Sequence, residues 1–273
     1  MSIVSLLVLL ALLSGLGWLA RARRLRAERF ARLNDLLVQA NAGDDRFILD
    51  SIDGLPVPAR IYLRHALAAN TPLPRSADIR MSGSLWVGGE DWVPFEAHQR
   101  ICAERGFIWE ARITALRRLQ VRGADWLFGE DAGIEYTLGG WWPILDRRGT
   151  DISRSALGRL MVELIWLPSA LTPQRGARWA RGDTDRAVVT PAGSSTPMTV
   201  VVSDDGCLRE ASIMRRRVEA NGEMSLSSFG ISVEAEERFG DCHVPSRLVA
   251  AWGIGTDARQ DFMRVAVDDI RWL

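Results

Sequence analysis

The sequence contains no lysine, so all 34 of its basic residues are arginines, and 34 acidic residues bring the formal net charge to zero. Proteins that bind nucleic acids usually carry a basic surplus, because contacts to phosphates supply much of the affinity, so no nucleic-acid partner is expected. Three cysteines in 273 residues, an odd number in a long chain, give no disulfide framework. With 47% hydrophobic and 25% charged residues, the composition also excludes collagen, low-complexity disorder and a polytopic membrane protein.

Motifs for catalysis and metal binding are equally scarce. The three histidines are His65, His98 and His243. No pair of them has the spacing of metal ligands on a helix, and the chain has no HExxH motif, nucleophile elbow or Walker loop. The cysteines form no CxxC pair, and Cys242 and His243 are neighbours in a predicted strand, so they point to opposite faces. The sequence therefore predicts no catalytic residue, no metal site and no cofactor, and it indicates no particular protein partner.

One long hydrophobic run stands at the N-terminus. Residues 2–20 read SIVSLLVLLALLSGLGWLA without a charge, and as a helix they would extend roughly 28 Å, close to a hydrocarbon core of about 30 Å. Six arginines and one glutamate follow within residues 21–32. We predict an uncleaved single-pass helix in the bacterial inner membrane, with the lipid bilayer as the partner of residues 2–20; a cleaved signal peptide is the alternative. The positive-inside rule predicts a cytoplasmic soluble domain, with a periplasmic one as the alternative.

The remainder of the chain has the pattern of a β-rich protein. We assign residues 1–43 to the anchor and its basic helix, and residues 44–273 to a single soluble domain. A short helix is predicted after Pro58. From about residue 77, apolar and polar residues alternate in roughly ten or eleven runs that short turns separate, which predicts antiparallel strands with one buried face.

A second soluble helix is predicted at about residues 153–167, inside the series of strands. Its apolar stripe consists of Leu157, Leu160, Met161, Leu164 and Ile165. This stripe needs an apolar surface to cover it, and a large sheet must curl to protect its edges. We therefore predict a mainly β fold of the α+β class: an N-terminal transmembrane helix, then a curved antiparallel sheet or half-barrel with one internal helix on its concave face.

Tryptophan is abundant, with eleven residues against only two tyrosines. Most of the aromatic side chains lie between residues 86 and 166, on the predicted strands and the internal helix. One interpretation is a packed core; the other is an apolar cavity with large rings in its wall. For the second we predict these ligand-binding residues: Phe107, Trp109, Trp126, Tyr136 and Trp166.

Four segments resemble a widespread bacterial family of unknown function. They are LPVPARIYLRHAL (55–67), WVPFEAHQ (92–99), GFIWEAR (106–112) and ELIWLPSALTP (163–173). The resemblance implies an N-terminal membrane segment and one soluble domain, and it implies no catalytic residue. The order of helix and strands is also similar to the half-barrel carriers that move lipoproteins and lipids in bacterial envelopes. Those carriers act outside the cytoplasm, whereas the arginines after residue 20 favour the cytoplasm.

Three hypotheses about function follow. The first is a membrane-anchored protein that binds an apolar or lipid-like ligand, which accounts for the anchor, the aromatic residues and the absence of catalytic motifs. The second is a non-enzymatic scaffold at the membrane, which would have a solid core and an exposed apolar patch. The third is an enzyme acting on a membrane-derived substrate, which would gather ionisable groups in one deep pocket.

Overall fold

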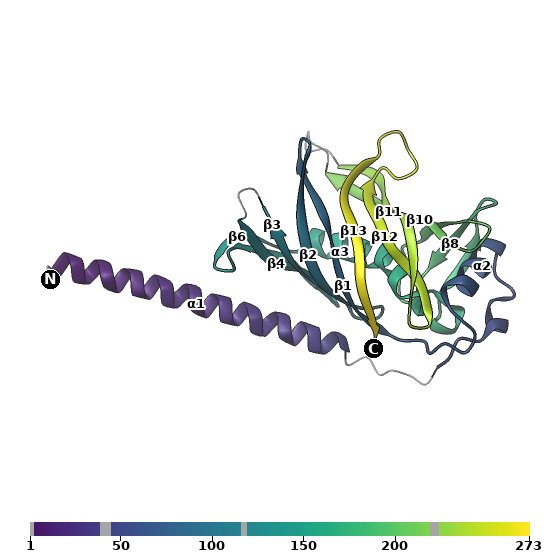
Figure 1. Cartoon of the computed structure of the whole chain (residues 1–273), viewed down its shortest axis with the longest axis horizontal. Helices are drawn as coiled ribbons and strands as arrows, with labels where there is room; N and C mark the ends of the chain where they lie inside the picture. The colour runs from purple at the N-terminus through teal and green to yellow at the C-terminus, as the bar shows by residue number, and fades with distance from the viewer. Residues whose placement is uncertain (1–2, 39–44, 116–118, 219–223) are drawn as a thin grey trace.

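The computed structural model describes residues 3–38, 45–115, 119–218 and 224–273 (Figure 1). The described α-helices are α1 (Ile3–Val38), α2 (Val57–Ala66) and α3 (Thr150–Glu163). Short 3₁₀ turns accompany them at Leu49–Ile52, Leu164–Trp166, Pro168–Leu171 and Pro173–Arg175. The short helix expected after Pro58 is confirmed, with Pro58 in its first turn, where a missing N–H costs nothing.

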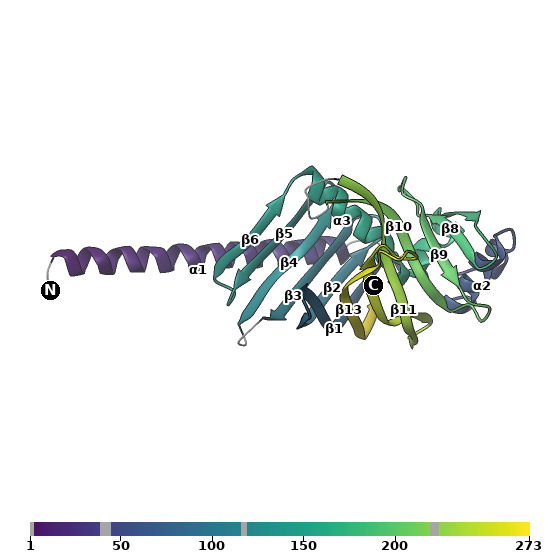
Figure 2. The same ribbon diagram turned by 90° about the horizontal axis from the view of Figure 1, so that it is seen from above.

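The strands form one open antiparallel sheet that curves through the molecule (Figure 2). In chain order they are β1 (Ser76–Gly88), β2 (Asp91–Cys102), β3 (Gly106–Thr114), β4 (Gln120–Phe128), β5 (Asp131–Leu138), β6 (Trp142–Arg148), β7 (Arg178–Arg181), β8 (Arg186–Thr190), β9 (Met198–Val202), β10 (Leu208–Val218), β11 (Met224–Phe239), β12 (Cys242–Trp252) and β13 (Gln260–Trp272). Their order across the sheet is β6-β5-β4-β3-β2-β1-β13-β12-β11-β10-β9-β8-β7. The predicted curved antiparallel sheet is therefore confirmed.

The ten or eleven strands expected from the sequence fall short of the thirteen described, and the alternation is weakest at the two edges of the sheet. Strand β6 is exposed along nearly its whole length, so neither of its faces shows an apolar alternation. Strand β7 has only four residues and is largely exposed as well. A strand without a buried face lacks the period-2 signal, which explains why ten or eleven strands were expected.

Helix α3 lies inside the curve of the sheet. It contacts β3, β4, β5 and β6 near one edge. It also contacts β10, which is separated from β3 by the five strands β2, β1, β13, β12 and β11. A helix reaches both groups only from the concave side, where Figure 2 shows it. Four residues of the predicted stripe are buried: Leu160, Met161, Leu164 and Ile165.

Two details of the predicted internal helix are wrong. Leu157, the first residue of the stripe, is 43% exposed, because α3 begins at the open side of the sheet. The α-helix ends at Glu163 rather than 167, and its last apolar residues continue as a 3₁₀ turn that ends at Trp166, before Pro168. The tighter turn still directs Leu164 and Ile165 into the core.

Helix α1 packs on the opposite, convex face of the sheet. Its C-terminal half buries three residues against the sheet: Phe30, Leu33 and Leu37. Beside this cluster, Arg26 and Arg29 both donate hydrogen bonds to the Glu135 carboxylate on β5. Burial acts to raise the pKa of Glu135, but the hydrogen bonds from the two arginines hold it below its ordinary value. The N-terminal half of α1 extends beyond the sheet (Figure 1).

The predicted membrane span falls on that projecting half. In the described parts of the chain, no helix is both long enough and apolar enough to cross a membrane. The structure of residues 1–2 and the side chains of residues 3–4, 6–9 and 11–12 lie outside what is described. The span predicted at residues 2–20 is thus not supported by the described residues and stays a prediction.

Candidate functional site

A cavity of about 570 Å³ lies between α3 and the concave face of the sheet. Its wall is formed by strands from both halves of the sheet, by α3 and by the 3₁₀ turn after it. The apolar side chains of the wall include Met81, Leu85, Ile113, Val121, Leu145, Ile152, Val162, Ile231, Leu248, Phe262 and Val265. Cavities of this size and apolar character are typical of sites for small molecules.

The structure brings the five predicted ligand-binding residues to this cavity, although not in equal roles. Phe107, Trp109, Tyr136 and Trp166 belong to the core cluster that surrounds it, and each is buried. Trp166 is only 4% exposed and donates a hydrogen bond from Nε1 to the carbonyl oxygen of Pro245 at 2.9 Å, so it is a fixed part of the wall.

Trp126 borders the cavity but packs mainly elsewhere. It belongs to the separate cluster under α1, where its ring centroid lies 5.8 Å from that of Phe30. The guanidinium of Arg29 stacks on the same ring at 4.9 Å. The contacts of Trp126 with Phe30 and Arg29 therefore help to attach α1 to the sheet.

A buried polar network lies along one side of the otherwise apolar cavity. Arg159 on α3 donates hydrogen bonds to Asp125 Oδ2 at 2.8 Å and to Glu163 Oε1 at 2.6 Å. Gln99 donates from Nε2 to Glu163 Oε2 at 2.6 Å. Burial raises the pKa of Asp125, helped by the nearby Glu163 charge and opposed by Arg159. The enzyme hypothesis requires ionisable residues gathered in one pocket, and this network is such a group. Its charged side chains, however, form ion pairs with one another.

Three polar atoms in the wall of the cavity are left over after this pairing. They are Gln99 Oε1, Asp125 Oδ1 and Trp109 Nε1. Each is buried, and none has a hydrogen-bond partner within the described part of the chain. Because a buried polar atom without a partner costs free energy, these atoms favour an occupant, water or ligand, that has polar groups of its own.

Arg215 on β10 brings a second cation to the cavity. Its guanidinium stacks on Phe229 at 4.5 Å and on Trp252 at 5.2 Å, and it donates a hydrogen bond to Ser155 Oγ on α3. Among the residues that the structure describes, none forms an ion pair with Arg215. Burial, and then the positive charge of Arg159, lowers the pKa of Arg215 to about 10. An anion bound beside this guanidinium would relieve both effects.

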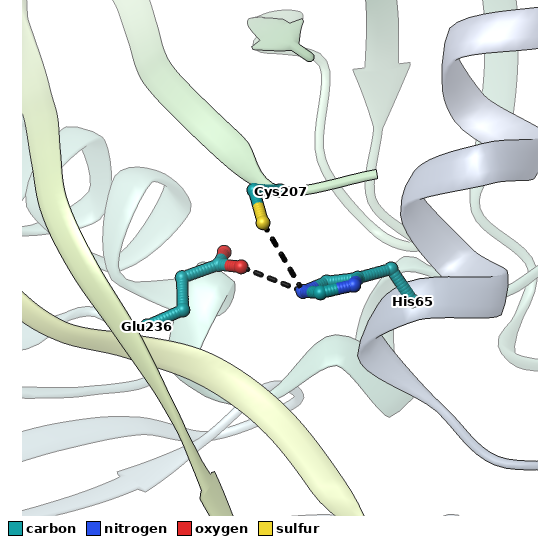
Figure 3. A group of neighbouring side chains, drawn as sticks. All are labelled: His65, Cys207 and Glu236. Atoms are coloured by element: carbon teal, nitrogen blue, oxygen red, sulfur yellow. Dashed lines mark hydrogen bonds and ion pairs between the residues drawn. The ribbon is translucent and has the colours of Figure 1, made fainter. Parts of the chain in front are cut away.

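A different group of side chains meets where α2 packs on the sheet (Figure 3). His65 Nε2 lies 2.7 Å from Glu236 Oε2 and 3.7 Å from Cys207 Sγ. Sequence reasoning missed this group, because its members are 142 and 29 positions apart in the chain and show no local motif. It lies outside the wall of the cavity.

The fold defines the chain as an open, curved antiparallel sheet with a helix inside its concavity. The chain belongs to a family of unknown function, DUF6544, whose model matches residues 46–264. This confirms the resemblance found in the sequence segments. No curated protein matches the chain.

Two solved structures show a remote similarity to this chain. One is a LolA-superfamily protein from Nitrosomonas europaea, with 10% identity, a TM-score of 0.41, and coverage of 79% of this chain and 92% of that one. The other is a putative outer membrane lipoprotein-sorting protein domain from Vibrio parahaemolyticus, with 7% identity, a TM-score of 0.37, and coverage of 72% and 85%. Similarities this remote say nothing about what this chain binds.

Proposed function

We propose that this protein binds an amphipathic, lipid-like molecule in the cavity under α3. The observation that supports the proposal is a cavity of about 570 Å³ whose wall is mostly apolar and includes a few ionisable groups, among them Arg159 and Arg215. An apolar chain would remove this wall from water at a gain of about 25 cal/mol per Å² of buried apolar surface. No histidine or cysteine belongs to the described wall, which favours binding over catalysis by the commonest acid, base and nucleophile.

Two donor groups of the wall, on Arg215 and Trp109, favour an acidic head group. Arg215 would face the anion from above Phe229, and Trp109 Nε1 offers a donor that has no partner in the described structure. Hydrogen bonds to a charged group contribute about 1.5–3 kcal/mol each, which is enough to prefer an acid over a neutral analogue. The proposed ligand is therefore a fatty acid or a lipid with a phosphate group.

Filling the cavity tests the proposal most directly. Ala156 on α3 belongs to the wall, so Ala156→Phe should place a ring inside and weaken binding of a fluorescent fatty acid by more than about tenfold, or about 1.4 kcal/mol. Leu157→Phe is the matched control, because Leu157 is the next residue of the same helix and is exposed. Probe titration of both variants would contradict the proposal if they bind equally well, or if the parent protein takes up no probe.

The same titration examines the head group. Arg215→Met should reduce affinity for the fatty acid while leaving affinity for the corresponding fatty alcohol unchanged, because only the acid offers a charge to the guanidinium. An equal loss for both ligands would assign Arg215 a structural role and remove the acidic head group from the proposal.

Attachment to a lipid bilayer through residues 2–20 is a second part of the proposal. Supporting it are the uncharged run and the exposure of Leu10, Leu13, Leu16 and Trp18, which are 52%, 55%, 59% and 65% exposed. Large apolar side chains in a row along a projecting helix favour an apolar environment. The arginines at residues 21–32 favour a cytoplasmic domain under the positive-inside rule.

Fractionation of cells tests this attachment. The full chain should sediment with membranes and resist a high-salt wash, and deletion of residues 2–20 should release it. A salt wash alone would free a protein that only its arginines hold to anionic lipid. Full-length protein in the soluble fraction would contradict the attachment without affecting the cavity proposal.

A further inference from the structure

Two of the three histidines and two of the three cysteines gather where α2 meets the sheet. The ring centroids of His65 and His243 lie 4.9 Å apart. The backbone of Cys242 forms an isolated antiparallel β-bridge with Leu67, just after α2. Cys207 completes the group from the turn between β9 and β10. In a chain with so few of these residues, such a gathering is informative, because histidine and cysteine are the commonest ligands of transition metals.

We propose that His65, Cys207 and Glu236 bind a divalent transition metal of the Zn²⁺ type. One donor atom from each residue lies within 4.8 Å of the other two. Figure 3 shows the imidazole, the thiol and the carboxylate converging from three separate elements of the chain. Nitrogen, sulfur and oxygen donors together form a set that Zn²⁺ and Co²⁺ accept, with the fourth position of a tetrahedron left to water.

The distances are close to those of a bound site. Metal–ligand bonds of about 2.0–2.3 Å in a tetrahedron place donor atoms roughly 3–4 Å apart. The distance of 3.7 Å from Cys207 Sγ to His65 Nε2 already falls in this range, and the 2.7 Å hydrogen bond from His65 to Glu236 has to widen only slightly. The donor atoms of the three residues all lie within 4.8 Å of one another, so only small side-chain movements are needed.

The surrounding backbone fixes two of the three ligands. Asp205 Oδ1 accepts a hydrogen bond from the Cys207 N–H at 3.2 Å, which holds the turn that presents the thiol. Glu236 Oε1 accepts from the Leu208 N–H at 3.0 Å, so the carboxylate keeps its other oxygen toward His65. Partners of this kind orient ligands around a metal and raise its affinity.

A glycine permits the approach of the turn to the helix. Gly206 has a φ of +91°, which favours glycine, and a Cβ atom there would lie 2.6 Å from His65 Cβ. Any other residue would push Cys207 away from α2. The chain thus has the one residue type that allows the turn and the helix to bring their donor atoms together.

The local charges also suit a cation. Glu236 brings a carboxylate, a group that attracts cations, to the site, with its Oε2 2.7 Å from His65 Nε2. A bound divalent cation deprotonates a coordinating thiol and neutralises the carboxylate. The metal would then connect α2 to β11 and to the turn before β10, in place of the hydrogen bond that joins His65 to Glu236.

Cobalt titration of the full-length protein tests the site. We expect one equivalent of Co²⁺ to bind and to produce the thiolate-to-metal absorption band that a cysteine ligand gives. Cys207→Ser should abolish the band, and His65→Ala or Glu236→Gln should weaken binding by more than about tenfold. The controls Cys102→Ala and His98→Gln change the same residue types far from the site and should leave the band intact.

Alkylation gives a readout that needs no variant. Zn²⁺ should slow the modification of Cys207 by iodoacetamide in the native protein, as peptide mass spectrometry would measure. The proposal is overturned if Co²⁺ produces no band with the full chain, if the band persists in Cys207→Ser, or if Zn²⁺ leaves the alkylation rate of Cys207 unchanged.

Discussion

Replacing Trp126 with alanine is expected to lower the free energy of unfolding by about 3–5 kcal/mol, the usual cost of removing a buried tryptophan. Trp126 is fully buried, and its ring contacts Phe30 and the guanidinium of Arg29 from α1. Its loss would leave a cavity between α1 and β4 and remove one of the contacts that hold the helix to the sheet. Chemical denaturation followed by circular dichroism would measure the change.

Trp142→Ala is the matched control, because Trp142 is 63% exposed on the edge strand β6 and should change stability by less than about 0.5 kcal/mol. Trp126→Ala should still bind the fatty-acid probe, since most contacts of the ring lie on the convex side of the sheet. Loss of probe binding with normal stability would instead assign Trp126 to the ligand, as the sequence predicted.

The case of Trp126 shows where sequence reasoning reaches its limit. In β3, Phe107 and Trp109 share a face with Tyr136 of β5, and alternation groups them correctly. In β4, Asp125 lies on that same concave side, whereas Trp126 belongs to the cluster under α1. A helix covers the convex face here, so both faces of β4 are buried and hydrophobicity does not distinguish them.

The curved sheet and its internal helix were predictable for a related reason. Most strands have one buried face, so period-2 alternation is strong, and the buried stripe of α3 matches the concave surface that those strands offer. The polar network of Arg159, Asp125 and Glu163 was not predictable. Arg159 and Glu163 are one helical turn apart, a spacing that in sequence indicates an ordinary exposed ion pair.

Contacts between distant positions were also beyond prediction. His65 lies beside Cys207 and Glu236 only because α2 packs against a part of the sheet that comes much later in the chain. Both residues follow His65 by more than 140 positions. Arg215 reaches the cavity because β10 curves toward β3 and β4 around α3. In both cases tertiary packing brings distant residues together, and no local sequence pattern encodes these contacts.

Replacing Arg159 with leucine is expected to cost about 3–5 kcal/mol at neutral pH, because it leaves two half-buried carboxylates without their cation. The side chains of Arg159, Asp125 and Glu163 are only 19%, 22% and 14% exposed. Arg154→Leu is the matched control: Arg154 lies on the same helix with its side chain 80% exposed, and its change should cost less than about 0.5 kcal/mol.

The loss caused by Arg159→Leu should shrink as the pH falls. Burial already raises the pKa of Asp125 above its ordinary value of 3.8, and without Arg159 the pKa rises further. For an acid whose pKa is higher in the folded state, the folded protein binds more protons than the unfolded one between the two pKa values. The stabilisation that comes from protonating Asp125 is therefore complete below its pKa in the unfolded state. It is lost as the pH rises through its pKa in the folded state.

Denaturation of the parent protein and of Arg159→Leu at a series of pH values from neutral to about 4 would measure this dependence. We expect the two stabilities to converge toward acid pH, as the Asp125 carboxylate becomes neutral and no longer needs the guanidinium. In the Arg159→Leu background, Asp125→Asn should recover part of the lost stability at neutral pH, because it removes one of the unpaired charges. A loss that is the same at every pH would mean that Arg159 stabilises the fold through its stacking on Phe107 and Trp109, at 4.9 and 5.0 Å, rather than through its charge.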